Sequence, residues 1–365
     1  MFVEANLDVN SRPQDRCTSF TPPIAHMRQL DSYAHIFPQD YFARMTAMAR
    51  DHGAIKRWLN IPVLHDLDAR LRLMERHPTY QQILTLSNPP IEMIAGPAEA
   101  PELARLANDG MAKIRDSHPI KFPAFVASLP MNNVPAALEE LDRAIRILGA
   151  RGVQVFTNVN GRPLDDPEFL PIFEAAANLY DVPVWMHPAR GAGMPDYLSE
   201  AKSKYEIWWT FGWPYETSAA MTRMVFSGFF ERWPNLKVIT HHMGGMIPFF
   251  DGRVGPGLDQ FGTRTPDEDY AGLLRRMAKR PVDYFRMFYA DTALAGGSSG
   301  IRCGLDFFGS EQVVFATDCP FDPEGGAMFL RTIPQAIDSL CLPREAQEAI
   351  YFRNALRLLK LPCHC

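Results

Sequence analysis

Short apolar runs alternate with longer amphipathic stretches along almost the whole chain, and this alternation limits the possible folds more than any other feature. The runs are rich in β-branched and aromatic residues and have the length of buried strands. They lie at 29–37, 80–86, 122–129, 152–157, 182–187, 236–242, 285–292 and 312–318. Apolar residues at helical spacing occupy the intervals, chiefly at 101–117, 134–148, 167–177, 217–230 and 331–339. Strands that alternate with helices predict an α/β protein with a parallel sheet.

The number of strand–helix units predicts the architecture. Eight units favour a (β/α)8 TIM barrel, and a doubly wound open sheet is the alternative. α/β barrels commonly reach this length as one domain, so we expect a single domain over residues 26–362. Residues 1–25 are polar and aperiodic, and we expect them to be a poorly ordered N-terminal leader.

Composition argues against several classes of function. The chain has 365 residues, of which 47% are hydrophobic and 22% are charged, as in ordinary globular proteins. A formal charge of −5 provides no basic surface for nucleic acid or an anionic membrane. No apolar run approaches the ~20 residues that span a bilayer, and the first residues lack the apolar segment of a secretion signal. The six cysteines show no CxxC spacing, so we expect a reducing, cytoplasmic location.

Polar residues stand at the ends of five of the strand-like runs. They are Tyr33 and His35, then His187, then His241 and His242, then Asp291, and finally Asp318. In a parallel barrel these ends lie on one face, so the side chains are expected to converge there. A strand that ends in solvated polar residues would explain any one of them, but not their recurrence. Converging imidazoles and carboxylates suit a divalent transition metal such as Zn²⁺ or Mn²⁺.

Seven motifs extend the argument to nearly the whole chain. They are LDSYAHIFP (30–38), SLPM (128–131), GVQV (152–155), WMHP (185–188), GWPYET (212–217), HMGGMIPF (242–249) with Gly252-Arg253, and ATDCPF (316–321). In this order they resemble the amidohydrolase superfamily, specifically the branch containing aminocarboxymuconate-semialdehyde decarboxylase and the resorcylate-type decarboxylases. The resemblance implies a distorted barrel, one divalent metal (Zn or Mn), and non-oxidative removal of a carboxylate from an aromatic or unsaturated acid.

The resemblance also implies roles for individual residues. By position, the metal ligands would be His35, His187 and Asp318, the catalytic groups His242 and Asp318, and the substrate contacts Trp209 and Arg57. His241 has no counterpart that we can assign. Members of this branch are often dimers, so we expect a homodimer that binds a small carboxylic acid.

One departure from the family pattern affects the metal site. The first strand of the family usually ends in His-x-His and both histidines bind the metal, but here Tyr33 stands at the first position. A phenol with a pKa of about 10 is a poorer ligand than imidazole at neutral pH. Tyr33 could coordinate the metal, hydrogen-bond to a metal-bound water, or mark a site that has weakened or lost its metal. We expect a retained metal on His35, His187 and Asp318, with Tyr33 as the remaining candidate ligand.

These residues favour a metal-dependent decarboxylase of a small aromatic or unsaturated carboxylic acid. In this hypothesis Asp318 delivers a proton to the ring carbon and His242 polarises an oxygen or activates water. A hydrolase of the lactone or amide type and a hydratase are alternatives, since both use the same kind of site. The family's hydrolytic branch carries a metal-bridging lysine after the fourth strand, and the run ending at 156–158 has none. A non-catalytic, ligand-binding barrel is the second alternative, because Tyr33 replaces a ligand histidine.

Overall fold

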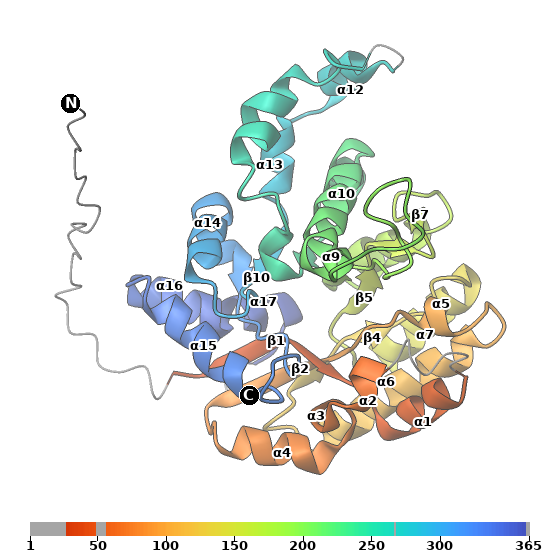
Figure 1. The fold of residues 1–365 in the computed structure, drawn as a ribbon, viewed down its shortest axis with the longest axis vertical. Helices are drawn as coiled ribbons and strands as arrows, with labels where there is room; N and C mark the ends of the chain where they lie inside the picture. The colour runs from red at the N-terminus through yellow and green to blue at the C-terminus, as the bar shows by residue number, and fades with distance from the viewer. Residues whose placement is uncertain (1–26, 49–55, 266–267, 363–365) are drawn as a thin grey trace, which may run out of the picture.

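Parallel strands followed by helices recur along the chain in a computed structural model, which describes residues 27–48, 56–265 and 268–362 (Figure 1). The leader expected at 1–25 lies outside the described residues. The parallel strands are β1 (Gln29–Ile36), β2 (Tyr80–Leu86), β3 (Ala124–Phe125), β4 (Ala127–Ser128), β5 (Val153–Phe156), β8 (Val184–His187), β9 (Val238–Thr240), β10 (Tyr289–Asp291) and β11 (Val313–Val314). A small antiparallel hairpin, β6 (Asn158–Val159) and β7 (Arg162–Pro163), follows β5.

The strands form an eight-membered ring. Its hydrogen-bonded orders are β1-β2-β3 and β11-β10-β9-β8-β5-β4, and β3 and β4 are two parts of one extended segment that pairs with β2 and then with β5. The ring closes where Ser32 N donates to the carbonyl of Phe315 at 2.8 Å and Ala34 bridges Cys319 in parallel. The split at β3–β4 and the short β11 make this a distorted (β/α)8 barrel. The predicted barrel is therefore confirmed, and the open-sheet alternative is wrong.

Helices cover the outside of the ring, and shorter helices lie within the connections that follow the carboxyl ends of the strands. They are α1 (Gln39–Met48), α2 (Lys56–Leu59), α3 (Pro62–His65), α4 (Leu67–Glu75), α5 (Ile91–Ile94), α6 (Ala100–Ser117), α7 (Val134–Arg146), α8 (Leu170–Glu174), α9 (Ile207–Thr210), α10 (Gly212–Phe226), α11 (Phe229–Arg232), α12 (Tyr270–Arg276), α13 (Pro281–Phe285), α14 (Ser298–Phe308), α15 (Ala327–Asp338), α16 (Arg344–Glu348) and α17 (Asn354–Leu359). Within the described ranges, no helix combines the length and the apolar character that crossing a membrane requires.

Local sequence explains where the helices begin. Asn133 precedes α7, and its side chain accepts a hydrogen bond from Ala136 N at 3.3 Å, which satisfies one of the free N–H groups of the first turn. A proline follows in that turn, where its fixed φ suits a helix and its missing N–H costs nothing. α4 is capped in the same way by Asp66, which accepts from Ala69 N at 3.1 Å.

The barrel interior is apolar beneath the carboxyl ends of the strands. Trp185 of β8 is fully buried there and packs with Leu30, Ile83 and Ile239 from three other strands. Its indole N–H donates to the carbonyl of Ser32 at 2.8 Å, so the ring carries no unsatisfied polar atom into the core. This packed layer gives the strand ends a rigid base and closes the barrel below the site.

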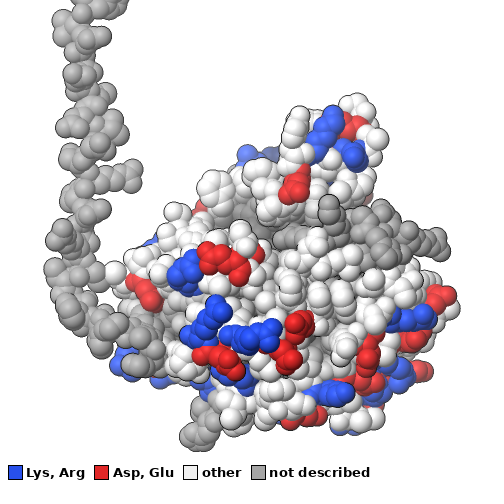
Figure 2. All heavy atoms as spheres, turned by 60° about the horizontal axis from the view of Figure 1, so that its bottom comes forward, with Lys and Arg blue, Asp and Glu red and all other residues white. Residues whose placement is uncertain are grey.

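Charged side chains of both signs are interspersed over the face shown in Figure 2, with no large area of one sign. This distribution agrees with the small formal charge of −5.

Candidate active site

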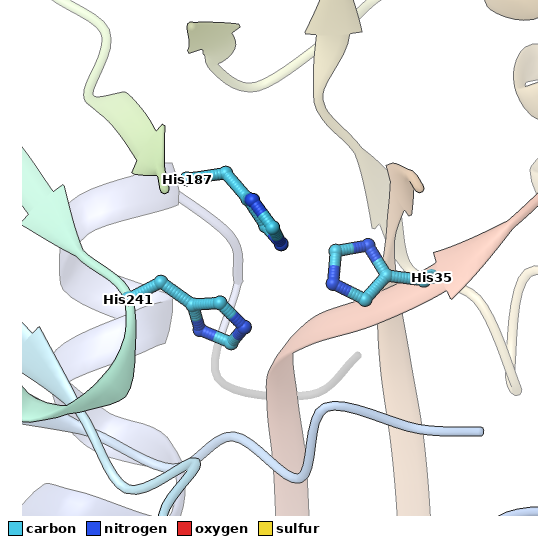
Figure 3. A group of neighbouring side chains, drawn as sticks. All are labelled: His35, His187 and His241. Atoms are coloured by element: carbon cyan, nitrogen blue, oxygen red, sulfur yellow. The ribbon is translucent and has the colours of Figure 1, made fainter. Parts of the chain in front are cut away.

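Three imidazoles from three strands point toward one space at the carboxyl end of the barrel (Figure 3). His35 comes from β1, His187 ends β8, and His241 directly follows β9. Their ring centroids lie 5.2 Å apart for His35 and His187, 5.0 Å for His187 and His241, and 5.8 Å for His35 and His241. The sequence predicted that strand ends would converge, and the structure brings these three together.

Each of these histidines is anchored through Nδ1, which leaves Nε2 for the shared space. His187 Nδ1 donates to the carbonyl of Pro188 at 2.8 Å, and His35 Nδ1 lies 3.1 Å from the hydroxyl of Thr85. His241 Nδ1 lies 2.5 Å from the carboxylate of Asp291. Partners of this kind fix the ring orientation and the tautomer of metal-binding histidines.

The carboxylate of Asp318 completes the cluster. Its Oδ1 lies 3.2 Å from His35 Nε2 and 3.4 Å from His241 Nε2, and its Oδ2 lies 3.8 Å from His242 Nε2. Burial alone would raise the pKa of Asp318, but the neighbouring imidazoles of His241, His242 and His35 hold it well below its usual value. Burial alone would likewise lower the pKa of His241, but Asp291 and Asp318 raise it to about 9. Asp318 is therefore ionised at neutral pH.

The donor set fits a divalent metal. Two overlapping groups, one of His35, His187 and His241 and the other of His241, His242 and Asp318, each have their ligand atoms within 4.8 Å of one another. His35 Nε2 is buried and makes no hydrogen bond within the described residues, since its approach to Asp318 lacks hydrogen-bond geometry. Buried polar atoms without partners are rare, and such an atom is suited to hold a ligand or ion. Imidazole nitrogen with carboxylate oxygen is a set that Zn²⁺ and Mn²⁺ both accept.

Tyr33 lies beside the cluster and is fully buried. Its ring stacks on that of His241, with centroids 4.0 Å apart and an interplanar angle of 23°. Its hydroxyl makes no hydrogen bond in the described part of the chain. Burial, followed by the charges of Asp291 and Asp318, raises the pKa of Tyr33 well above its usual value, so the side chain is a neutral phenol.

His242 follows His241 in an unusual backbone turn that keeps the two rings side by side. His242 and Met243 have φ values of +56° and +55°, which are uncommon for residues with side chains. Gly244 and Gly245 follow with φ of +75° and +63°, and a Cβ at Gly245 would lie 2.5 Å from the carbonyl oxygen of Pro214. Across this tight left-handed turn the two imidazoles stay in contact, with ring centroids 3.7 Å apart. His241 points into the barrel and His242 lies at the pocket wall.

A pocket of about 370 Å³ opens above the cluster. Asp318 and His242 form its polar part, and most of the remaining wall is apolar or aromatic. The lining residues are Trp209, Thr210, Trp213, Pro214, His242, Ala293, Leu294, Ala295, Asp318, Phe321 and Phe329. This combination of an apolar wall with few polar groups is typical of a site for a small flat ligand.

The residues expected to contact substrate have different outcomes. Trp209 lies in the pocket wall, where its indole N–H donates to Glu206 at 2.8 Å. Trp213, which the sequence did not distinguish from a packing residue, is nearer the cluster, with its ring 5.7 Å from that of His187. The side chain of Arg57 lies outside the described residues, so its predicted contact with substrate stays a prediction.

Asp291 and His241 are the site residues whose roles the sequence left open. The register of the sheet places them together, because Ala290 pairs with Thr240 and the next residue of each strand is Asp291 and His241. A polar residue at the same position of two neighbouring strand ends was the signal available in the sequence. Using it required the register, which a single sequence does not supply.

The profile of the amidohydrolase family matches residues 31–361. The chain belongs to this family. It is 33% identical over 256 residues to the 2-amino-3-carboxymuconate-6-semialdehyde decarboxylase of Dictyostelium discoideum, covering 70% of this chain and 67% of that protein. It is 32% identical over 301 residues to a gamma-resorcylate decarboxylase of a Polaromonas species, covering 78% and 87%. The resemblance seen in the motifs is therefore confirmed.

A solved structure agrees with these relatives. A dihydroxybenzoic acid decarboxylase from Polaromonas, with bound manganese and the inhibitor 2-nitroresorcinol, superposes with a TM-score of 0.71 at 25% identity, covering 92% of this amidohydrolase chain and 97% of that one. The chain thus lies in the decarboxylase branch of the amidohydrolase family.

Proposed function

We propose that this protein is a metal-dependent carboxy-lyase that releases CO₂ from a small aromatic or unsaturated carboxylic acid without oxidation. The observation that carries the proposal is the placement of Asp318, an ionised carboxylate that faces three imidazoles on one side and an aromatic-walled pocket on the other. Relatives that act on such acids support the substrate class.

We assign the metal to His35, His187 and Asp318, with Tyr33 as a neutral neighbour. When bound, a divalent metal supplies Lewis-acid polarisation of the substrate's oxygens and a template that orients them. The protein's own residues then determine where the proton goes and what excludes water.

The proton transfer in this proposal passes through Asp318. For an ortho-hydroxy acid, the hydroxyl proton goes to the Asp318 carboxylate and from there to the ring carbon that carries the carboxylate. The C–C bond then breaks and CO₂ leaves. The electron pair of that bond returns through the ring to the former hydroxyl oxygen, which takes a proton from solvent. Protonation before cleavage avoids a free carbanion. His242 lies at the pocket wall, where it can donate a hydrogen bond to a substrate oxygen.

The wall of the pocket favours a planar substrate. Trp209, Trp213 and Phe321 line the pocket, and Phe321 lies near His35, with ring centroids 5.6 Å apart. Flat rings stack on such faces, and the apolar wall excludes water from the reacting carbon.

The experiment measures CO₂ release from a panel of acids by the purified protein. The panel contains 2,6-dihydroxybenzoate, 6-methylsalicylate and a muconate-type acid, with benzoate as a control that lacks the ortho oxygen. We expect CO₂ from at least one acid of the first three, loss of the activity after chelation, and recovery with Mn²⁺ or Zn²⁺. Hydrolysis of a lactone or amide panel with no CO₂ from any acid would instead establish the hydrolase alternative.

The proposal also includes Zn²⁺ or Mn²⁺ as the metal, a homodimer and a cytoplasmic location. Exposed aromatic side chains next in sequence to pocket-lining residues, Phe211 and Tyr215, support a subunit contact. The cysteines Cys303 and Cys319 are free thiols, which supports a reducing compartment. Light scattering of the purified protein tests the dimer.

A further inference from the structure

The position of Tyr33 leaves the first strand with one imidazole, and the structure supplies another from a different strand. His241 is fully buried and its ring lies within 5.8 Å, centroid to centroid, of both His35 and His187. It is also the one residue that belongs to both groups of potential metal ligands found among the described residues.

The orientation of His241 suits coordination through Nε2. Its Nδ1 lies 2.5 Å from Asp291 Oδ2, so the hydrogen of a neutral ring belongs on Nδ1 and the lone pair on Nε2. Nε2 lies 3.4 Å from Asp318 Oδ1, on the side of the shared space. His35 and His187 are arranged in the same way, with Nδ1 anchored and Nε2 toward that space.

Asp291 is held firmly enough to serve as this anchor. Its side chain is fully buried, and its second oxygen, Oδ1, accepts the backbone N–H groups of His242 and Ala293, each at 3.0 Å. One oxygen is thus fixed by the backbone and the other is left for His241. Carboxylate–histidine pairs of this type orient metal ligands and raise their basicity.

Tyr33 has the contacts of a packing residue. Its ring stacks on His241 at 4.0 Å, and its hydroxyl has no hydrogen-bond partner within the described ranges. Stacking over a face of the imidazole restricts the rotation of His241 and leaves the ring edge, where Nε2 lies, open.

We propose that His241 is a metal ligand of this protein, that it replaces the imidazole missing at Tyr33, and that Asp291 positions it. The metal would then be held by His35, His187, His241 and Asp318. This inference rests on the proposed metal dependence. It moves the fourth ligand from Tyr33 on β1 to His241 at the end of β9. The rival reading is that His241 and Asp291 form a structural ion pair with no contact to the metal.

The test measures metal affinity directly, with Mn²⁺ and Zn²⁺ added to chelator-treated protein. We expect His241→Ala and His241→Asn to weaken binding by at least about 100-fold, beyond the ~10–100-fold typical for loss of a residue that supports a ligand, and Asp291→Asn to fall within that range. Tyr33→Phe should change the affinity by less than about 3-fold, because it removes only an unbonded hydroxyl. His65→Asn is the matched control, since His65 stacks on Phe42 and belongs to neither group of potential metal ligands.

A double variant makes the test independent of general damage. Tyr33→His with His241→Ala moves the imidazole from β9 to β1. We expect the double variant to bind the metal at least about 10-fold more tightly than His241→Ala alone, because a ligand is restored. The absorption spectrum of the Co²⁺ form provides a second readout, because it changes with the number and type of ligands. We expect a changed spectrum in His241→Asn and a wild-type spectrum in Tyr33→Phe. Circular dichroism confirms that each variant is folded.

The outcomes separate this inference from the proposed function. Wild-type affinity in both His241 variants, or loss of the metal in Tyr33→Phe, overturns the ligand assignment and leaves metal-dependent decarboxylation standing. Metal binding that depends on His241, without CO₂ release from any acid, supports the assignment and overturns the decarboxylase. A wild-type protein that binds neither metal overturns both.

Discussion

Two aspartates at neighbouring strands of the barrel, Asp31 and Asp318, are both enclosed by the protein yet have opposite electrostatics. Asp31 of β1 accepts hydrogen bonds at Oδ1 from the backbone N–H groups of Tyr33 and Thr317, each at 3.1 Å. Its Oδ2 accepts from the hydroxyls of Tyr80 and Thr317. Burial raises the pKa of Asp31 to about 6, in spite of these hydrogen bonds, whereas the pKa of Asp318 is held well below its usual value by its histidines.

The difference lies in what surrounds each carboxylate. The donors around Asp31 are neutral amide and hydroxyl groups. Each of them makes its hydrogen bond to Asp31, and these bonds connect β1 to the segment after β11. The groups around Asp318 are imidazoles, whose Nε2 atoms can carry either a proton or a metal, and one side of Asp318 faces the pocket. A carboxylate whose oxygens are fully hydrogen-bonded to neutral donors stabilises the packing of the strands. A carboxylate with free hydrogen-bonding capacity, next to groups that can exchange a proton or a metal, is available for chemistry.

The largest expected effect is that of Asp318→Asn on catalysis. The amide cannot carry a proton to the ring carbon and is a weaker metal ligand, so we expect kcat/KM for CO₂ release to fall at least about 1,000-fold. Some stability should be lost as well, since the amide gives the imidazoles no charged partner, but we expect this loss to stay below that of Asp31→Ala. Steady-state kinetics and urea unfolding of the same preparation check both. Activity within 10-fold of wild type would remove Asp318 from the proton path.

Asp31→Ala should show the reverse pattern. It leaves four buried donors without an acceptor, so we expect the free energy of unfolding to fall by about 4 kcal/mol, at about 1 kcal/mol or more per group. Asp31→Asn keeps one acceptor oxygen, and we expect about half of that loss. kcat/KM per folded molecule of the Asn variant should stay within about 10-fold of wild type, because the residue does not line the pocket. Lost activity at unchanged stability would contradict the structural role.

The pH dependence of stability sharpens the contrast at Asp31. Its folded-state pKa is raised from 3.8 to about 6, so the folded protein binds this proton more tightly than the unfolded chain does. Its contribution is therefore fully present below pH 3.8 and is lost as the pH rises through about 6. By linkage the change amounts to about 3 kcal/mol. The stability difference between wild type and Asp31→Asn, followed by urea unfolding from pH 4 to pH 7.5, should shrink as the pH rises. A constant difference would show that Asp31 does not titrate in this range.

Much of the fold was readable from the sequence because the barrel strands are buried on both faces. The runs at 80–86 and 152–157 contain β2 and β5 almost residue for residue, since short runs of strand length bounded by turns leave little ambiguity. The ends were less clear. The run at 312–318 contains only a two-residue strand, β11, because the chain leaves the ladder to place Asp318 at φ +62°. A strained functional position of this kind departs from local patterns.

The sequence predicted part of the site, and the part that it did not predict depends on the register of the strands. The sequence singled out His35, His187 and Asp318, and in the structure His35 lies 3.2 Å from Asp318 and shares one group of potential ligands with His187. The pairing of His241 with Asp291 depends on which residues of β9 and β10 lie side by side. Local sequence carries no such information, because register is set by packing across the sheet.

A third aspartate, exposed at the opposite end of the barrel, provides the smallest effect. Asp181 precedes β8 and pairs with Lys237 and Lys360, whose Nζ lies 2.6 Å from Oδ2. The hydrogen bonds from Lys237 and then Lys360 lower the pKa of Asp181, so its contribution is present above pH 3.8 and is lost as the pH falls below that value. Water screens these pairs, so we expect Asp181→Asn to cost less than about 1 kcal/mol at neutral pH and to leave activity unchanged.

High salt separates this surface pair from the buried network of Asp31. In about 1 M salt the screening length falls to about 3 Å, and the stability difference between wild type and Asp181→Asn should become too small to measure. The cost of Asp31→Asn should persist, because its partners are neutral and shielded from solvent. Urea unfolding of both variants at low and high salt makes the comparison. If high salt removed the stability loss of both variants equally, the role of Asp31 would depend on long-range charge. Its hydrogen bonds to neutral donors would then not explain its effect on stability.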